Sequence, residues 1–271
     1  MYLEHYRLKH APFDITPNPR FLFHSSKHRE AFNHLLYGIR ERKGFVQLTG
    51  EVGAGKTTLC RALLDQLDPH YSTALILNPM LSADELMQAI ATEFGLNVQG
   101  EDRRGTVSAI SEFLLRQLEY GKESVLIIDE AQNLTEDLLE QVRLLSNIET
   151  DDRKLLQIVL MGQPELRDRL NSPRLKQLRQ RITVRFHLAP LSRAEVAQYI
   201  HHRLQVSGAN GVPCFTRPAV WRVFNYSGGI PRLVNAVCDK ALLAGFVQSS
   251  DHINYTMVGR AIRELEGNIN S

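Results

Sequence analysis

The chain has 271 residues and a formal net charge of +2, from 32 basic and 30 acidic residues. Hydrophobic residues make up 43% and charged residues 23%, a composition that is ordinary for a globular protein and argues against wholesale disorder. So small a charge is no electrostatic footprint for nucleic acid, and it neither favours nor excludes such a partner.

The sequence shows neither a paired-cysteine motif nor a targeting or membrane-spanning segment. The three cysteines form no CxxC pair, the N-terminus has no signal-peptide pattern, and no apolar stretch approaches the ~18 residues of a membrane span. We therefore expect a cytoplasmic protein, whose attachment to any membrane would need a partner.

The first forty residues read as an extended segment followed by a helix. Pro12, Pro17 and Pro19 favour an extended path, because proline fixes φ and restricts the residue before it. A helical pattern follows over about Lys27–Glu41.

Short apolar runs then alternate with helical segments, one of which opens at the capping box Ser82–Glu85. The runs are Phe45–Thr49, Thr73–Leu77, Val125–Asp129, Ile158–Met161 and Ile182–Leu188. Strands that alternate with helices predict a parallel sheet covered on both faces, a three-layer α/β core over about residues 1–190.

After Pro190 only helical patterns are found. A second capping box at Ser192–Glu195 opens a helix to about Val206, and Pro231 suits the first turn of another. Further helices are expected over about Pro218–Tyr226, Pro231–Val247 and Tyr255–Leu265. We therefore expect a small all-helical lid domain over residues 191–271.

One segment fits the phosphate-binding pattern GxxxxGK[ST] at every position, between a strand-like and a helix-prone run. Its residues, with the threonine that follows, are Gly50, Glu51, Val52, Gly53, Ala54, Gly55, Lys56, Thr57 and Thr58. Glycines let backbone N–H groups wrap phosphates, Lys56 offers a cation to the β- and γ-phosphates, and the Thr57 hydroxyl can ligate Mg²⁺. A chance glycine-rich turn is the alternative. The pattern predicts ATP and Mg²⁺ as ligands.

Two adjacent carboxylates end the run Val125–Asp129. Asp129 is placed to hold Mg²⁺ through water, and Glu130 to orient and polarise the attacking water. A solvated glutamate at a strand end is the alternative for Glu130. An Asp–Glu pair also favours the P-loop branch whose catalytic acid follows this strand (the ASCE branch).

Four further polar residues are candidates for the same site. Gln163 follows a strand that is expected to lie between the strand before the phosphate loop and the strand before Asp129. It is a candidate sensor of the γ-phosphate, or else a turn residue before Pro164. Arg179 or Arg181 is a candidate finger that reaches the nucleotide of a neighbouring subunit; a solvated basic face is the alternative. Arg232, after two glycines and a proline, is a candidate contact of the lid to the γ-phosphate.

The chain resembles the AAA+ ATPases of the ExeA / general secretion pathway protein A type. The resemblance rests on the phosphate loop, the DEAQ run from Asp129, the GQPEL run from Gly162, the GGIPR run from Gly228 and the N-terminal signature MYLEHY…APFD…PNPRFLF. The resemblance covers almost the whole chain. Within the family, the chain most resembles the short MshM-type members that accompany a mannose-sensitive haemagglutinin type IV pilus. Longer members add a transmembrane helix and a peptidoglycan-binding domain, which we do not expect here.

The resemblance implies an ATPase that forms a homo-oligomer and helps assemble a type IV pilus or type II secretion machine, with inner-membrane assembly proteins as partners. Two other functions stay open: a DNA-linked ATPase such as a transposition regulator, and a nucleotide-dependent oligomerisation switch with little turnover. A basic stripe or added DNA-binding domain is not evident, so nucleic acid is the less favoured partner. A helicase is discounted, because the residues after Pro190 are too few for a second RecA-like domain.

Overall fold

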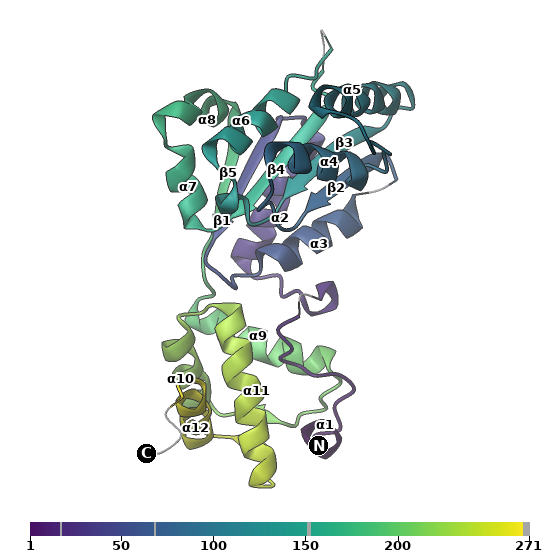
Figure 1. Cartoon of the computed structure of the whole chain (residues 1–271). Helices are drawn as coiled ribbons and strands as arrows, with labels where there is room; N and C mark the ends of the chain where they lie inside the picture. The colour runs from purple at the N-terminus through teal and green to yellow at the C-terminus, as the bar shows by residue number, and fades with distance from the viewer. Residues whose placement is uncertain (17, 68, 151–152, 268–271) are drawn as a thin grey trace. The chain divides into compact units, whose positions relative to one another are not determined.

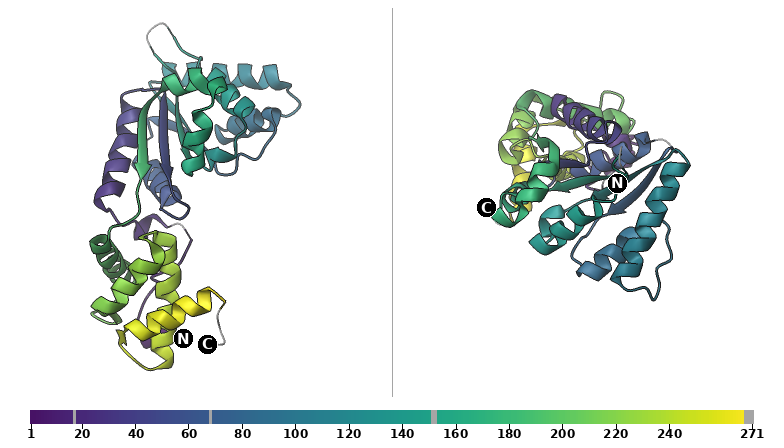
Figure 2. Two further views of the ribbon diagram at one scale, coloured as in Figure 1. Left: turned by 90° about the vertical axis from the view of Figure 1, so that its left-hand side faces the viewer. Right: turned by 90° about the horizontal axis from the view of Figure 1, so that it is seen from above.

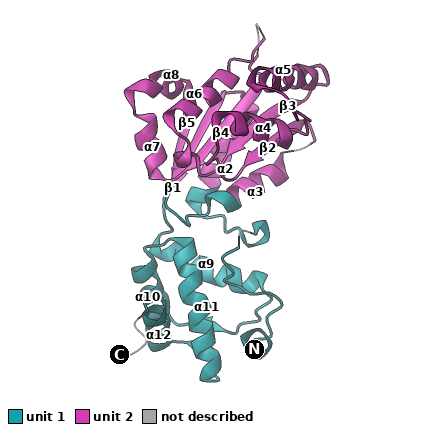
Figure 3. Ribbon diagram, viewed as in Figure 1, with its two compact units in different colours: residues 1–28, 51–58, 189–271 teal, residues 29–50, 59–188 magenta. Residues whose placement is uncertain are grey.

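A computed structural model describes residues 1–16, 18–67, 69–150 and 153–267, so Pro17 of the expected extended segment lies outside the described residues. The chain divides into two compact units, coloured separately in Figure 3. The sheet unit comprises Arg29–Gly50 and Leu59–Leu188. The helical unit comprises Met1–His28, Glu51–Thr58 and Ala189–Ser271.

The sheet unit is built on five parallel strands in the order β2-β3-β4-β1-β5 (Figure 1). They are β1 (Phe45–Gly50), β2 (Tyr71–Ile76), β3 (Glu123–Ile128), β4 (Leu156–Gly162) and β5 (Ile182–Leu188). The predicted parallel sheet is confirmed, and β4 lies between β1 and β3 as expected. Because all the strands run the same way, the residues that follow β1, β3 and β4 emerge at one edge of the sheet.

Helices cover both faces of the sheet, as the continuous apolar strands require. Alternate strand residues, such as Leu126, Ile128 and Ile158, pack into one core with helices α4 to α8. On the opposite face Gly38 of α2 lies so close to Val46 that a Cβ there would overlap it. Figure 2 shows α2, in purple, on one side of the strands and the teal helices on the other. The helices are α2 (Ser26–Arg40), α3 (Lys56–Gln66), α4 (Ala83–Glu93), α5 (Arg103–Glu119), α6 (Glu136–Leu145), α7 (Pro164–Leu170) and α8 (Lys176–Arg181), with short 3₁₀ turns η2 (Ala131–Asn133) and η3 (Pro173–Leu175).

The helical unit packs its helices around an apolar core that includes Val196, Val223 and Val237. Its elements are α1 (Tyr2–His5), the 3₁₀ turn η1 (Pro19–Phe21), α9 (Arg193–Val206), α10 (Arg217–Ser227), β6 (Cys214–Phe215), α11 (Pro231–Val247), β7 (His252–Ile253) and α12 (Tyr255–Leu265). The expectation of helices alone is wrong in one detail: β6 and β7 pair in parallel. Two-residue strands are too short to leave a period in the sequence. Among the described helices, none is long and apolar enough to span a bilayer.

Both predicted capping boxes are confirmed. The Ser82 hydroxyl accepts from the Glu85 backbone N–H at the start of α4, and the Glu85 carboxylate accepts from the Ser82 N–H. Ser192 and Glu195 form the same reciprocal pair at the start of α9. Each box satisfies backbone donors that a helix N-terminus would otherwise leave unpaired.

The N-terminal segment belongs to the helical unit, which differs from its expected place in a core of residues 1–190. Tyr6 and Phe13 are fully buried in the helical core. The buried guanidinium of Arg203 in α9 donates to the carbonyls of Pro12 and Asp14, the latter at 2.9 Å. The sequence could not reveal this, because the partners lie about 190 residues apart and share no periodic pattern.

Candidate active site

The phosphate loop lies in the helical unit, between the end of β1 at Gly50 and the start of α3 at Lys56. Gly53 and Gly55 have φ of +77° and +100°, in the region that only glycine enters without strain. The Lys56 ammonium is buried and donates to the carbonyl of Glu51 at 3.1 Å. Lys56 and Thr57 thus stand in the first turn of a helix, where backbone N–H groups and the helix dipole favour phosphate.

Two hydrogen bonds hold the tip of this loop from outside it. The backbone N–H of Arg232, in the first turn of α11, donates to the carbonyl of Gly53 at 3.2 Å. The His28 imidazole Nε2 lies 3.1 Å from the carbonyl oxygen of Ala54. Consecutive carbonyls of the loop are therefore tied to α11 and to α2, which reduces the conformational freedom of the loop.

The surroundings of His28 define its protonation. A carbonyl oxygen only accepts, so Nε2 carries the proton, and Nδ1 accepts from the Ser25 hydroxyl at 2.7 Å. Burial lowers the pKa of His28 below its usual 6.5, which keeps this neutral tautomer. Next to it, the Ser26 N–H and hydroxyl donate to Glu195 of the α9 capping box at 3.2 and 3.0 Å. The start of α2 thus contacts both the phosphate loop and α9.

The backbone of Arg232 is bound to the phosphate loop, but its side chain is not held in the same way. Its guanidinium is exposed and makes no ion pair with a described residue. The structure therefore places the backbone of Arg232 against the loop and leaves its charged group free to reach an added anion.

In the sheet unit, the two predicted carboxylates follow β3 directly. Asp129 is buried, and its Oδ1 accepts from the backbone N–H of Glu130 at 2.9 Å. Glu130 has φ of +51° and ψ of +34°, a left-handed conformation that is uncommon for a non-glycine residue. Such backbone strain is typical of functional sites, where the surrounding structure holds it in place.

Two glutamines hold the carboxylate of Glu130. The side-chain amides of Gln132 and Gln163 donate to its Oε2 at 2.5 and 3.2 Å. The Gln132 side-chain oxygen accepts from the backbone N–H of Gln163 at 3.0 Å, which fixes the orientation of the Gln132 amide. Gln163 occupies the N-cap position of α7, but its side chain does not cap that helix. The structure thus brings Gln163 to Glu130 and adds Gln132, which the sequence analysis did not single out.

The two candidate finger arginines have different surroundings. Arg181 donates to the Ser146 hydroxyl at the end of α6, at 2.7 Å. Arg179 lines a cavity of about 270 Å³ together with Arg167 and Arg185. No acidic residue lines this cavity among the described residues, so Arg179 has the more anion-accepting surroundings of the two.

Sequence reasoning missed Gln132 and His28 as partners of the site. The sequence signal for Gln132 was its place two residues after Glu130. In the structure it lies in the turn η2, from which its amide donates to the Glu130 carboxylate. His28 left no signal, because its contact to the loop joins residues 26 positions apart through the tertiary fold.

Comparison with known proteins shows which proteins this chain is similar to. Residues 39–170 match the AAA domain family, a stretch that includes the phosphate loop, β3 and β4. The chain therefore contains an AAA domain over these residues. Over 98% of its length it is 47% identical to General secretion pathway protein A of Aeromonas hydrophila, and it spans 49% of that relative.

Solved structures of low sequence identity share the fold of this chain. The Aeropyrum pernix ORC2 protein in its ADP form gives a TM-score of 0.69 at 16% identity, covering 93% of this chain and 72% of that one. The Thermotoga maritima RuvB branch migration motor gives 0.59 at 19% identity, covering 89% and 69%. At such identities the likeness establishes the fold and not the activity.

Proposed function

We propose that this AAA domain protein binds ATP with Mg²⁺ and hydrolyses it. The observation that carries the proposal is the complete GxxxxGK[ST] loop, with two glycines at positive φ, opening α3 at Lys56. A hydroxyl at Thr57 and a carboxylate at Asp129 are the oxygen ligands that Mg²⁺ prefers, directly or through water. The donor set therefore fits a magnesium nucleotide.

The residues of the chain then have distinct roles. Lys56 neutralises charge on the β- and γ-phosphates, and Mg²⁺ held by Thr57 and, through water, by Asp129 would supply further positive charge. Glu130 accepts a proton from a water that attacks the γ-phosphorus, while the bond from that phosphorus to the β-phosphate oxygen breaks and ADP leaves.

Four other side chains support this step. Gln132 and Gln163 position the Glu130 carboxylate through the hydrogen bonds described above. The guanidinium of Arg232 contacts the γ-phosphate from the helical unit. Arg179 is the better candidate for a finger to a neighbouring subunit, because its bond to the Asn171 carbonyl is long, at 3.4 Å, whereas Arg181 is bound to Ser146 at 2.7 Å.

The test compares ATP binding, ATPase rate and oligomeric mass for wild type, Lys56→Ala and Glu130→Gln. We expect Lys56→Ala to lose ATP binding, and Glu130→Gln to bind ATP while turnover falls about 100-fold or more. Glu119→Gln, an exposed change at the end of α5, is the control with the same loss of charge. Hydrolysis by Glu130→Gln at the wild-type rate would remove Glu130 from the mechanism.

We further propose that the activity serves assembly of an envelope machine, as in MshM-type proteins of a type IV pilus or in type II secretion. The support is the similarity to General secretion pathway protein A along almost the whole chain. The partners would be copies of this chain and assembly proteins at the cytoplasmic face of the inner membrane. Normal pilus and secretion assembly in cells that carry only Lys56→Ala would contradict this role.

The same measurements, repeated with added DNA, separate the two alternatives. DNA-stimulated turnover with steep salt dependence would indicate a DNA-linked ATPase. Slow turnover with a stable oligomer that forms only with ATP would indicate a switch.

A further inference from the structure

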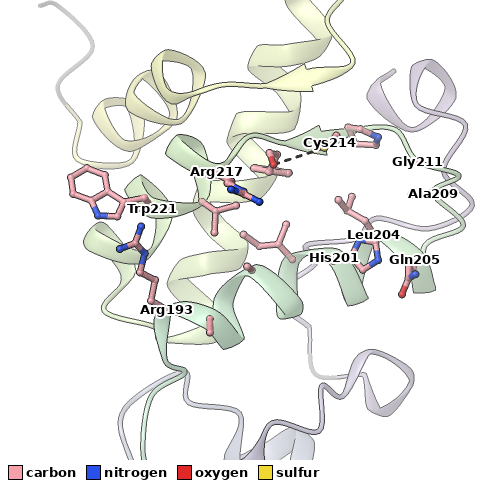
Figure 4. A pocket seen from close by; sticks show the side chains of 15 residues that line it. Arg193, His201, Leu204, Gln205, Ala209, Gly211, Cys214, Arg217 and Trp221 are labelled. Atoms are coloured by element: carbon pink, nitrogen blue, oxygen red, sulfur yellow. Dashed lines mark hydrogen bonds between the residues drawn. The ribbon is translucent and has the colours of Figure 1, made fainter.

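The helical unit contains an open groove between α9 and α10, bounded at one end by the segment that leads into β6 (Figure 4). Its volume is about 670 Å³. The apolar residues along it include Ile200, Leu204, Pro213, Phe215, Val220 and Trp221. None of the proposed ATP-site residues lines it, so the groove is a separate feature.

The charges around this groove are of one sign. Arg193 and Arg217 line it, both are exposed, and neither forms an ion pair with a described residue. His201 adds an imidazole, and the described lining contains no aspartate or glutamate. The complementary partner is therefore apolar and carries carboxylates.

The shape of the groove favours a helix as its occupant. Lining residues of α9 run from Arg193 to Gln205, twelve positions, which correspond to about 18 Å along a helix axis. Between them Ala194 and Ala197 are exposed and carry only methyl groups, so a second helix can approach closely. A groove of this length accepts the i, i+3, i+4 and i+7 side chains of an amphipathic helix.

Trp221 provides a fixed aromatic surface at the Arg193 end of the groove (Figure 4). It is 39% exposed and stacks on Tyr255 of α12, with ring centroids 6.4 Å apart. The guanidinium of Arg222 covers the same tyrosine at 4.2 Å, which holds the stack in place. Exposed, rigid tryptophan beside arginine is the composition found at the centres of protein interfaces.

We propose that this groove binds an acidic amphipathic helix of a partner protein. The apolar face of the partner helix lies along Ile200, Leu204 and Trp221, and its flanking carboxylates pair with Arg193 and Arg217. The proposal is independent of the ATPase function, because it uses no residue of the phosphate loop or of the Glu130 cluster.

The chain contains a single tryptophan, so the fluorescence of Trp221 reports on the groove directly. The probe is an 18-residue synthetic helix with leucines at i, i+3, i+4 and i+7 and glutamates beside them. Its matched twin has lysines in place of the glutamates. We expect the acidic peptide to change Trp221 emission saturably, and its lysine twin to bind about tenfold more weakly at low salt.

Charge reversal tests the two arginines. In the double variant Arg193→Glu, Arg217→Glu the preference should reverse, so that the lysine peptide binds more tightly. Arg263→Glu, an exposed change on α12, is the matched control and should leave the preference unchanged. Ala197→Tyr, which fills the groove without changing charge, should weaken both peptides. Unchanged circular dichroism and unchanged ATP binding show that each variant is folded.

Two results would overturn the proposal. Equal affinity for the acidic and lysine peptides would show that the arginines select nothing. An apolar dye that binds beside Trp221 and is displaced by neither peptide would identify a small-molecule pocket instead, since 670 Å³ also suits such ligands.

Discussion

Replacing Gly53 by alanine tests the contact between the phosphate loop and α11. Gly53 has φ of +77°, and an L residue there costs about 1–2 kcal/mol. The new Cβ would overlap the Cβ of Arg232 and lie 3.1 Å from its Cδ. Relieving that overlap costs about 1–3 kcal/mol. It moves α11 away from the loop and weakens the Arg232 N–H bond to the Gly53 carbonyl, worth about 1 kcal/mol. We expect a loss of about 2–5 kcal/mol, because reduced freedom of the unfolded chain offsets a part of these costs.

The matched control is Gly211→Ala in the same unit. Gly211 has φ of +84°, but no heavy atom lies within 4 Å of its Cβ position, so only the backbone cost of about 1–2 kcal/mol applies. Urea unfolding followed by Trp221 fluorescence measures both variants, and a fluorescent ATP analogue measures nucleotide affinity. Gly53→Ala should unfold at lower urea and bind ATP more weakly than Gly211→Ala. Equal midpoints and equal affinities would refute the argument that the loop is packed against α11.

Three further predictions concern the other contacts of the two units. Gln132→Ala should lower kcat about tenfold with little change in ATP affinity, because the Glu130 carboxylate loses its closer hydrogen bond; an unchanged kcat in single-turnover assays would argue against this role. Stability should fall as pH drops below 6.5, where the unfolded chain protonates and buried His28, with its lowered pKa, does not. His28→Gln should flatten that decline in urea titrations at a series of pH values, and an identical slope would assign it to other groups. Arg203→Leu should cost about 3–5 kcal/mol and release the segment around Phe13 to limited proteolysis, because two backbone carbonyls lose their donor; resistance equal to that of wild type would contradict the anchoring.

Local patterns determined much of this protein from the sequence alone. The strands were recognisable because each is a short apolar run, and both capping boxes because their partners lie three residues apart. The phosphate loop and the Asp129–Glu130 pair were recognisable for the same reason: each is contiguous in the chain, so its spacing carries its chemistry.

The tertiary structure decided which distant groups support those motifs. Gln132 and Gln163 meet at Glu130 only because β3 and β4 are neighbours in the sheet. His28 reaches the phosphate loop, and Arg203 holds the N-terminal segment, through hydrogen bonds between residues 26 to about 190 positions apart. Such contacts leave no periodic trace in a single sequence, because they depend on how whole elements pack and not on the spacing of residues within one element.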